Sequence, residues 1–344
     1  MKTKISIKVL CFVAIASLAL LLAAPLTESQ AQDLPKSIGI GTHPKGSLLN
    51  VVGSAFAKVF SAKLGIEATD RPYMGYTAWL PLVNRGELDL GICTSFDPHY
   101  GYRGMKPYRE KLSNLRLIAS GSKLNTGWVT PVTSGIKSLS DLKGKRVAMN
   151  RTMVSSMKLQ EGSLIAAGLD PKKDIRVIPG AGVAEEVRSL IEGRSDVCWG
   201  AVGMALIKEL IAKRGPIRWI PMIDAPESEM AKKSLDAGPG ADYEFVKAGK
   251  KRTVGNDTWL WAAPIYLMGH KGLSDEGAYQ LAKTTWESQK DLIAVHPVFR
   301  GWKHETTVSK RAVVPYHPGA IRFYKEQGVW PAEMDQVQKR LLSE

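Results

Sequence analysis

Cysteine is scarce in this sequence. The 344 residues contain three cysteines, with no Cys-x-x-Cys pair and no cysteine and histidine at zinc-binding spacing. This scarcity excludes a disulfide-stapled scaffold and disfavours a structural zinc site, so we expect neither a metal nor another cofactor. Cys93 and Cys198 lie in apolar, strand-like runs, where we expect buried free thiols. A disulfide between them is the less favoured alternative.

Acidic residues are fewer than basic ones. There are 33 Asp and Glu against 47 Lys and Arg, which gives a formal net charge of +14. A basic balance can indicate nucleic-acid binding, but these Lys and Arg residues are scattered and form no long basic block or recognised module. We therefore expect no nucleic-acid partner. The diffuse charge instead favours anionic solutes or the acidic surface of a membrane.

Long hydrophobic runs are absent after residue 24. The apolar run at residues 9–24 is 16 residues long, shorter than the ~20 that a membrane span requires. Basic residues precede it, and Ser29-Gln30-Ala31 follows as a small-x-small cleavage site. Residues 1–31 are therefore predicted to be a signal peptide, cleaved after Ala31, that sends the protein to the periplasm. A retained membrane anchor is the alternative.

Familiar catalytic patterns are missing as well. The sequence has no Ser-His-Asp order with a nucleophile elbow and no His-Glu-x-x-His, and its six histidines do not cluster. The glycines at 39, 41 and 46 have neither the dinucleotide-binding nor the nucleotide-phosphate spacing. We therefore expect a protein that is not an enzyme. A secreted α/β enzyme is the less favoured alternative, because it would need a nucleophile with a nearby base or a metal site.

Strand-like and helix-like segments alternate in the first part of the chain. Strands are expected at residues 38–41, 66–70 and 88–93, with helices at 47–64 and 77–85. The first of these helices has its apolar residues on one face and is followed by a glycine, a residue typical of helix ends. This alternation is typical of a mostly parallel sheet with helices on its faces.

The same alternation returns after residue 135. The segments expected there are strands at 146–150, 175–178, 196–199 and 217–221, and helices at 156–167, 183–192 and 204–213. Residues 222–257 are rich in Gly, Pro and charge, and we expect them to form a surface excursion. Beyond them we expect a strand at 259–268, a long helix at 274–295, and helices at 318–327 and 332–342.

Both parts of the chain contain the same local signature. A predicted helix ends at Gly86 or Gly193, and Asp89 or Asp196 opens a strand three residues later. Glycine suits the left-handed conformation that ends a helix, and aspartate can hold the turn that follows. The repetition supports two lobes of similar construction.

Three stretches of the sequence are distinctive when taken together. They are Leu-Ser-Asp-Leu-Lys-Gly-Lys-Arg-Val-Ala at 139–148, the helix-Gly-x-x-Asp-strand segment at 187–197, and Pro-Tyr-His-Pro-Gly-Ala at the start of 315–328. Together they resemble the TAXI class of solute-binding receptors, which serve tripartite ATP-independent periplasmic (TRAP) transporters. The His-Pro-Gly-Ala run is the most specific of the three. The resemblance extends over residues 38–330.

The resemblance implies a fold and a function. The fold is α/β: a two-lobed periplasmic binding protein fold of type II, each lobe a mostly parallel sheet flanked by helices, with hinge strands between the lobes. Residues 32–127 and 258–344 would form lobe 1, and residues 128–257 lobe 2. The function would be to capture a small organic anion in the cleft between the lobes and deliver it to the permease subunits of a TRAP transporter. A substrate-binding protein of an ABC importer has the same fold and is the alternative; in either case we expect a monomer.

Ligands of open parallel α/β sheets bind at the carboxyl ends of strands, where helix N-termini offer unpaired N–H groups. The loops at 41–47, 73–77, 94–96 and 150–156 fall in this position. Three of them depart from the pattern of the TAXI class, so the resemblance specifies the fold better than the ligand. Helix capping is the alternative role for their hydroxyl groups. The candidate ligand-binding residues are Thr42, His43, Lys45, Ser47, Tyr73, Gly75, Tyr76, Thr77, Thr94, Ser95, Asn150, Arg151, Thr152, Ser155, Ser156 and Trp199.

Arg151 is the candidate for a charged contact. It follows a predicted strand and precedes a predicted helix, where its guanidinium group could bind a carboxylate with two hydrogen bonds. A solvated surface role is the alternative. Tyr73, Tyr76 and Trp199 could form the walls of the cleft, although aromatic residues at such positions are as often part of a core. If they line the cleft, the ligand should carry an apolar or aromatic part beside its acid group.

Overall fold

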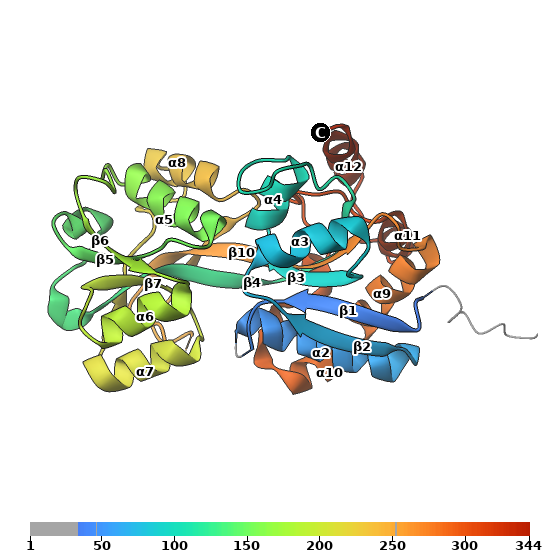
Figure 1. The fold of residues 1–344 in the computed structure, drawn as a ribbon, viewed down its shortest axis with the longest axis horizontal. Coiled ribbons are helices and arrows are strands. Elements are labelled where there is room, and N and C mark those ends of the chain that lie inside the picture. The colour runs from blue at the N-terminus through green and yellow to red at the C-terminus, as the bar shows by residue number, and fades with distance from the viewer. Residues whose placement is uncertain (1–33, 46, 252) are drawn as a thin grey trace, which may run out of the picture. The chain divides into compact units, whose positions relative to one another are not determined.

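A computed structural model describes residues 34–45, 47–251 and 253–344 (Figure 1). The predicted signal peptide, residues 1–31, lies outside the described residues. Within the described ranges, no helix combines the length and the apolar character that crossing a membrane requires.

The first part of the chain alternates strands and helices, as predicted. Its elements are β1 (Ser37–Thr42), α2 (Leu48–Leu64), β2 (Glu67–Pro72), α3 (Tyr76–Arg85), β3 (Leu90–Thr94) and α4 (Phe96–Tyr102). β1 pairs in parallel with β2 on one side and with β3 on the other. The side chain of Ser47 caps α2 by accepting a hydrogen bond from the backbone N–H of Asn50 at 3.2 Å, and Gly65 closes the helix with a φ of 66°.

The second alternating part has the same plan. Its elements are β5 (Arg146–Asn150), α5 (Val154–Ala166), β6 (Arg176–Gly180), α6 (Val183–Ile191), β7 (Val197–Ala201) and α7 (Ala205–Arg214). β5 pairs in parallel with both β6 and β7. α5 packs with α8 (Glu229–Ala237), and α6 packs with α7. Figure 1 shows the two helix pairs on opposite faces of these strands.

Two long strands join both sets into one sheet. β4 (Leu115–Pro131) and β10 (Thr258–His270) are antiparallel neighbours, and β10 also pairs with β3 while β4 pairs with β7. The resulting order is β2-β1-β3-β10-β4-β7-β5-β6. Two shorter strands, β8 (Ile217–Trp219) and β9 (Asp242–Val246), extend it by pairing with β4 and β10. The sheet is therefore mixed, with parallel sets on either side of an antiparallel centre.

The β4–β10 pair is irregular in its middle. The register shifts between Pro264 and Tyr266 and again between Leu267 and Met268. Such irregularities bend a strand and increase its local twist. The lobe limits predicted from the sequence, 32–127 with 258–344 and 128–257, place one border within β4 and one at the start of β10. These limits stay a prediction.

The remaining chain is mostly helical. It contains α9 (Asp275–Glu287), α10 (Gln289–Val295), α11 (Pro318–Glu326) and α12 (Glu333–Ser343). The prediction of a single long helix at 274–295 is wrong, because the helix is interrupted at Ser288. One turn earlier, Thr285 Oγ1 donates to the carbonyl of Leu281 at 2.8 Å, a side-chain bond of the kind that bends helices. Short 3₁₀ segments occur at Val132–Ser134, Leu139–Leu142, Pro297–Gly301 and His304–Thr306.

The prediction of a surface excursion at residues 222–257 is wrong in part, because this segment contains α8 and β9. The side chain of Ser228 caps α8 by accepting from the backbone N–H of Ala231 at 3.1 Å, and Ala231 is fully buried. Tyr243 of β9 lies opposite Trp261 of β10 in the sheet. The segment therefore covers the second core rather than leaving it.

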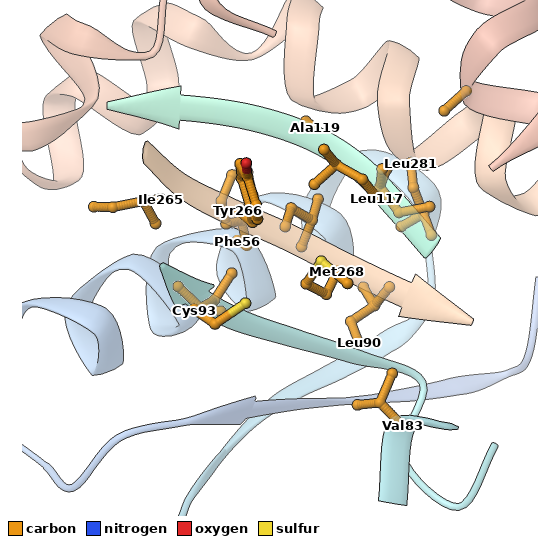
Figure 2. Close-up of a cluster of buried hydrophobic side chains, with 14 of the residues drawn as sticks. Phe56, Val83, Leu90, Cys93, Leu117, Ala119, Ile265, Tyr266, Met268 and Leu281 are labelled. Carbon is orange, nitrogen blue, oxygen red and sulfur yellow. The ribbon is translucent and has the colours of Figure 1, made fainter. Parts of the chain in front are cut away.

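The largest core surrounds β1, β3 and the adjoining halves of β4 and β10. Figure 2 shows its centre, where Leu90 and Cys93 of β3 lie beside Tyr266 and Met268 of β10. Phe56 of α2 packs into the same cluster. Cys93 is a free, buried thiol, as expected.

A second core lies among β4, β5, β7 and β10. It contains Trp128, Trp199 and Trp261, and Trp128 meets Trp199 edge-on with ring centroids 5.2 Å apart. A third cluster, beneath α6 and α7, includes Cys198, which is also free and buried as expected. Because the cores share β4 and β10, the two long strands connect them.

The repeated glycine–aspartate signature has one structural role in both sets of strands. Asp89 Oδ2 accepts a hydrogen bond from the backbone N–H of Gly39 at 2.8 Å. Asp196 Oδ2 accepts from the backbone N–H of Arg146, also at 2.8 Å. Each bond joins residues 50 positions apart and ties the third strand of its set to the first. The two sets are therefore built alike at this point.

The His-Pro-Gly-Ala run forms the start of α11. His317 caps the helix, because its Nδ1 accepts from the backbone N–H of Gly319 at 3.2 Å, and its Nε2 lies 3.1 Å from the carbonyl oxygen of Leu273. A Cβ atom added to Gly319 would lie 1.9 Å from the backbone oxygen of Asp275 in α9. The glycine therefore permits α9 and α11 to approach closely.

Candidate functional site

Side chains from several strand ends meet where α4, beside the first core, approaches α5 of the second. His43 and Tyr76 are in ring contact, with centroids 4.2 Å apart. Tyr76 Oη lies 3.5 Å from Thr94 Oγ1 at the end of β3. Asp97 of α4 contacts Tyr108 and Ser155. We call this group the seam cluster; its members are His43, Tyr76, Thr94, Asp97, Tyr108 and Ser155.

Asp97 is the charged member of the seam cluster. It is 2% exposed, and its Oδ1 accepts a hydrogen bond from the hydroxyl of Tyr108 at 2.8 Å. Burial raises the pKa of Asp97 to about 6, and the hydroxyl groups of Ser155 and Tyr108 offset part of that effect. The carboxyl group therefore exchanges its proton close to neutral pH.

The other members of the seam cluster are neutral. Desolvation of its ring lowers the pKa of His43 to about 4, so the imidazole is uncharged at neutral pH. Burial raises the pKa of the phenols of Tyr76 and Tyr108 above their usual range, and the charge of Asp97 raises both further. The cluster thus combines one carboxyl group with hydroxyl groups, an imidazole and aromatic faces.

Lys158 connects α5 to the first part of the chain. Its Nζ lies 4.2 Å from the centroid of the Tyr100 ring of α4 and donates to the backbone oxygen of Lys106 at 3.3 Å. Together with the Ser155–Asp97 contact, these interactions join the start of α5 to α4. The seam is therefore closed in this structure.

A second polar network shapes the loop after β5. Asn150 Oδ1 accepts from the backbone N–H groups of Thr152 at 3.0 Å and Met153 at 2.7 Å. The backbone N–H of Asn150 donates to Gln160 Oε1, and Gln160 Nε2 donates to Glu186 Oε2, both at 2.8 Å. Glu186 is fully buried, and this burial raises its pKa to about 8, so its carboxyl group is mostly neutral at pH 7. The buried acid thus supports a predicted ligand loop through Gln160.

Arg151 and Trp199 do not join the seam cluster. Arg151 Nη1 forms an ion pair with Glu161 Oε1 of α5 at 3.1 Å, and both side chains are about one-third exposed. Trp199 is 2% exposed and packs against Trp128, so the structure places it in a core. A ligand could reach Arg151 by replacing its carboxylate partner, whereas Trp199 has no comparable access.

The other predicted site residues have varied surroundings. Thr42 donates to the carbonyl of His43 at 3.1 Å and accepts from Asn50, and Ser47 caps α2, so both have structural roles. Ser95 is fully buried. Gly75 precedes α3 in extended backbone, and Thr152 donates to the carbonyl of Ala181 at 3.0 Å. The half-buried members are Ser47, Tyr73, Gly75 and Ser156, and the exposed ones are Lys45, Thr77 and Thr152.

Five residues of these networks were not predicted from the sequence: Asp97, Tyr108, Lys158, Gln160 and Glu186. Asp97 stands three residues beyond the end of β3, so the strand-end rule that selected Thr94 would also have found it. The other four have no such signal, because they come from a loop and from helix positions that tertiary packing brings to the site.

Three buried polar atoms near the ends of β1 and β3 have no hydrogen-bond partner in the described part of the chain. They are Nε2 of His43, Oγ of Ser95 and Oδ2 of Asp97. Most buried polar atoms in proteins are hydrogen bonded, so such exceptions often mark functional sites. The site could bind a small polar solute through hydrogen bonds and aromatic contact.

A cavity of about 390 Å³ borders one side of the seam cluster. It is lined by Pro81, Pro107, Tyr108, Arg109, Glu110 and Leu112. It reaches the cluster only at Tyr108 and does not include the strand-end loops. Among residues 34–344 as described, no group of three or more His, Cys, Asp or Glu is arranged to hold a metal ion.

Two solved structures share this architecture. PhnD1 from Prochlorococcus marinus (MIT 9301), in complex with methylphosphonate, has a TM-score of 0.52 at 15% identity, over 86% of this chain and 100% of that chain. A binding protein component of an ABC phosphonate transporter from Pseudomonas aeruginosa has a TM-score of 0.51 at 11% identity, over 88% and 99%. The expected fold is confirmed: it is the two-lobed type II fold of periplasmic binding proteins. The second neighbour is named as a binding protein component of its transporter.

The family comparison covers most of the chain. It supports the class of solute-binding proteins but not the finer assignment to the TAXI class. The neighbour from Pseudomonas aeruginosa is a component of an ABC transporter. The model of the NMT1-like family matches residues 40–328. The chain therefore belongs to the NMT1-like family.

Proposed function

We propose that the protein is an extracytoplasmic receptor that binds a small organic anion between its two lobes and delivers it to a membrane permease. The observation that carries the proposal is the group of buried, unpartnered polar atoms at the ends of β1 and β3, beside the start of α5. A ligand held there would satisfy these atoms and be buried by closure of the lobes. The predicted signal peptide would bring the receptor to the periplasm.

Ligand binding without turnover would separate a receptor from a secreted enzyme. The sequence contains nine tryptophans, so closure of the lobes should change the intrinsic fluorescence. We expect a saturable fluorescence change with the true ligand and recovery of that ligand unchanged, as checked by mass spectrometry. Chemical conversion of the ligand would contradict the receptor function.

We propose an ABC importer as the membrane partner. The support is the shared fold with a binding protein component of an ABC phosphonate transporter, whereas a TRAP permease rests on the sequence resemblance to the TAXI class. Uptake by membranes that contain the cognate permease should then require the hydrolysis of ATP. Uptake driven by an ion gradient without ATP would assign the receptor to a TRAP system. In both cases we propose that the receptor is a monomer, which light scattering can test.

We expect the variant Arg151→Ala to bind the ligand at least about tenfold more weakly. Arg151 stands at the end of β5 and is paired with Glu161, a partner that a ligand carboxylate would replace. A hydrogen bond to a charged group contributes about 1.5–3 kcal/mol, which corresponds to tenfold or more in affinity. Isothermal titration calorimetry with the recovered ligand measures the change.

The matched control is Arg188→Ala, which removes an exposed arginine from α6 of the same lobe. Its affinity should stay within about twofold of the wild type, because surface substitutions away from a site have small effects. Unchanged affinity in Arg151→Ala would remove this residue from the site and leave the receptor function open to other contacts.

A further inference from the structure

Among the residues that the structure describes, none provides a cationic partner for the buried carboxyl group of Asp97. The side chain is 2% exposed, and Oδ1 accepts from the hydroxyl of Tyr108. In the described part of the chain Oδ2 makes no hydrogen bond, although the hydroxyl of Ser155 lies near enough to favour the ionised form. A buried carboxylate is costly unless it is paired or fully hydrogen bonded. The unpartnered oxygen can therefore accept a further donor.

Three tyrosines lie near this carboxyl group. The charge of Asp97 raises the pKa of Tyr76, Tyr100 and Tyr108, which places all three phenols within its field. The ring of His43 packs on Tyr76. An ammonium group suits such surroundings, because both a carboxylate and the faces of aromatic rings attract it. A ligand carboxylate at the same place would be repelled by Asp97.

The seam already holds one ammonium group. Nζ of Lys158 lies over the ring of Tyr100 at 4.2 Å and donates to the backbone oxygen of Lys106. Tyr100 lies three residues after Asp97 on α4. The aromatic surface around α4 therefore accommodates a primary amine from a neighbouring element.

We propose that Asp97 binds a positively charged amino group of the ligand, so that the solute carries an amino group as well as its acid group. This inference rests on the proposed receptor function and narrows the class of its ligand to amino acids and related zwitterions. The acid group would bind away from Asp97, with Arg151 as its candidate partner on the other lobe. Asp97 would then make the protein selective for organic acids that carry an amino group.

The proposal requires that the affinity of the protein for its ligand falls at low pH. Asp97 must be ionised to attract an ammonium group, so binding should weaken as the pH drops below about 6. The two imidazoles nearby do not titrate in this range, because burial lowers the pKa of His43 and of His99 to about 4. Burial raises the pKa of the remaining acids that face Asp97, so they keep their protons; these are Tyr76, Cys93, Tyr100 and Tyr108. Lys158 is the cation that approaches from α5.

Matched pairs of ligands test the proposal on the full mature chain. The probes are glutamate with glutarate, leucine with 4-methylpentanoate, and phenylalanine with 3-phenylpropanoate, each measured by tryptophan fluorescence and calorimetry at pH 5 and pH 7.5. In at least one pair, we expect the amino acid to bind about tenfold or more tightly than its partner at pH 7.5. We expect this preference to shrink at pH 5.

Two variants keep the test specific. Asp97→Asn preserves the size of the side chain but removes its charge, so the preference for the amino acid should fall to within about threefold and lose its pH dependence. Asp291→Asn removes an exposed carboxylate that pairs with Lys63 outside the seam cluster, so it should keep the preference. Melting temperatures of both variants show whether they are folded.

The outcomes distinguish the inference from the function on which it rests. If the deamino acid binds as tightly as the amino acid in every pair that binds, the role of Asp97 is overturned and the receptor function stands. An amino-acid preference that survives in folded Asp97→Asn also overturns it. If no member of any pair binds, the organic-acid receptor and the Asp97 subsite are both contradicted.

Discussion

The variant Gly319→Ala is expected to lose about 3 kcal/mol or more of its free energy of unfolding. A Cβ atom at this position would lie 1.9 Å from the backbone oxygen of Asp275 and 2.9 Å from the backbone nitrogen of Tyr279. Both obstacles are main-chain atoms of α9, so no side chain can rotate away to relieve the clash. Overpacking of a core usually costs about 1–3 kcal/mol, and a clash with backbone lies at the upper end of that range or beyond it. Chemical denaturation of the purified variant measures the loss.

Gly255→Ala is the matched control for this substitution. The nearest atom to a Cβ at Gly255 is a backbone oxygen at 3.7 Å, an ordinary contact distance, and its backbone does not have a positive φ. Its free energy of unfolding should therefore stay within about 0.5 kcal/mol of the wild type. Equal stability of Gly319→Ala and Gly255→Ala would show that α9 and α11 can separate at no cost.

The variant Glu186→Gln is expected to be more stable than the wild type at alkaline pH and nearly equal to it in acid. Glu186 is fully buried, and its pKa rises from 4.5 to about 8 on folding. Between these values the folded protein holds a proton that the unfolded chain releases. The stability of the wild type therefore falls as the pH rises through this window, by about 1.4 kcal/mol for each pH unit.

Glutamine escapes this loss because it does not ionise. Its amide oxygen can still accept the hydrogen bond from Gln160 that Glu186 Oε2 accepts at 2.8 Å. We expect a gain of about 2–4 kcal/mol at pH 8.5 and little difference near pH 4.5, as measured by urea denaturation. The control is Glu185→Gln at the next position, whose carboxylate forms an exposed pair with Arg194 and should contribute less than about 1 kcal/mol. A gain of the same size at both pH values would contradict a buried, neutral Glu186.

Most of the regular elements could be predicted from local pattern. α2 shows why: its apolar residues repeat at helical spacing, a serine caps its start and a glycine closes its end. The strands β1 and β5 are short, apolar and followed by helices, which is the signature of parallel α/β units. These features belong to neighbouring residues, so the sequence alone reveals them.

The elements that were missed depend on distant parts of the chain. β4 was not predicted, because residues 120–127 mix serine, glycine, lysine and asparagine, and this stretch is a strand only through its pairing with β10. α8 and β9 lie in a stretch rich in glycine and charge, and their packing on the second core stabilises them. The break at Ser288 was missed because the hydrophobic pattern continues through it.

The candidate site was predictable in position more than in chemistry. The strand-end rule selected His43, Tyr76, Thr94 and Ser155, which the structure brings into one cluster. It also selected residues that cap helices or lie in a core, because a sequence does not show which face of a loop a side chain occupies. The candidates predicted from the sequence included no acid. The place of Asp97 near the end of β3 could have been found from the sequence, whereas its burial and its unpartnered oxygen required the structure.

The pairing of β4 with β10 also bears on how the protein folds and unfolds. The two strands bring together residues far apart in sequence, such as Asn125 and Trp261, whose hydrogen bond spans 136 positions. Each strand contributes side chains to more than one core, so melting one core would leave its neighbour with unpaired strands. The two lobes should therefore unfold in a single cooperative transition, even though the proposed receptor function requires them to move apart when ligand is exchanged. Long-range pairing of this kind is formed late and slowly, so the chain should fold more slowly than its local α/β units could alone.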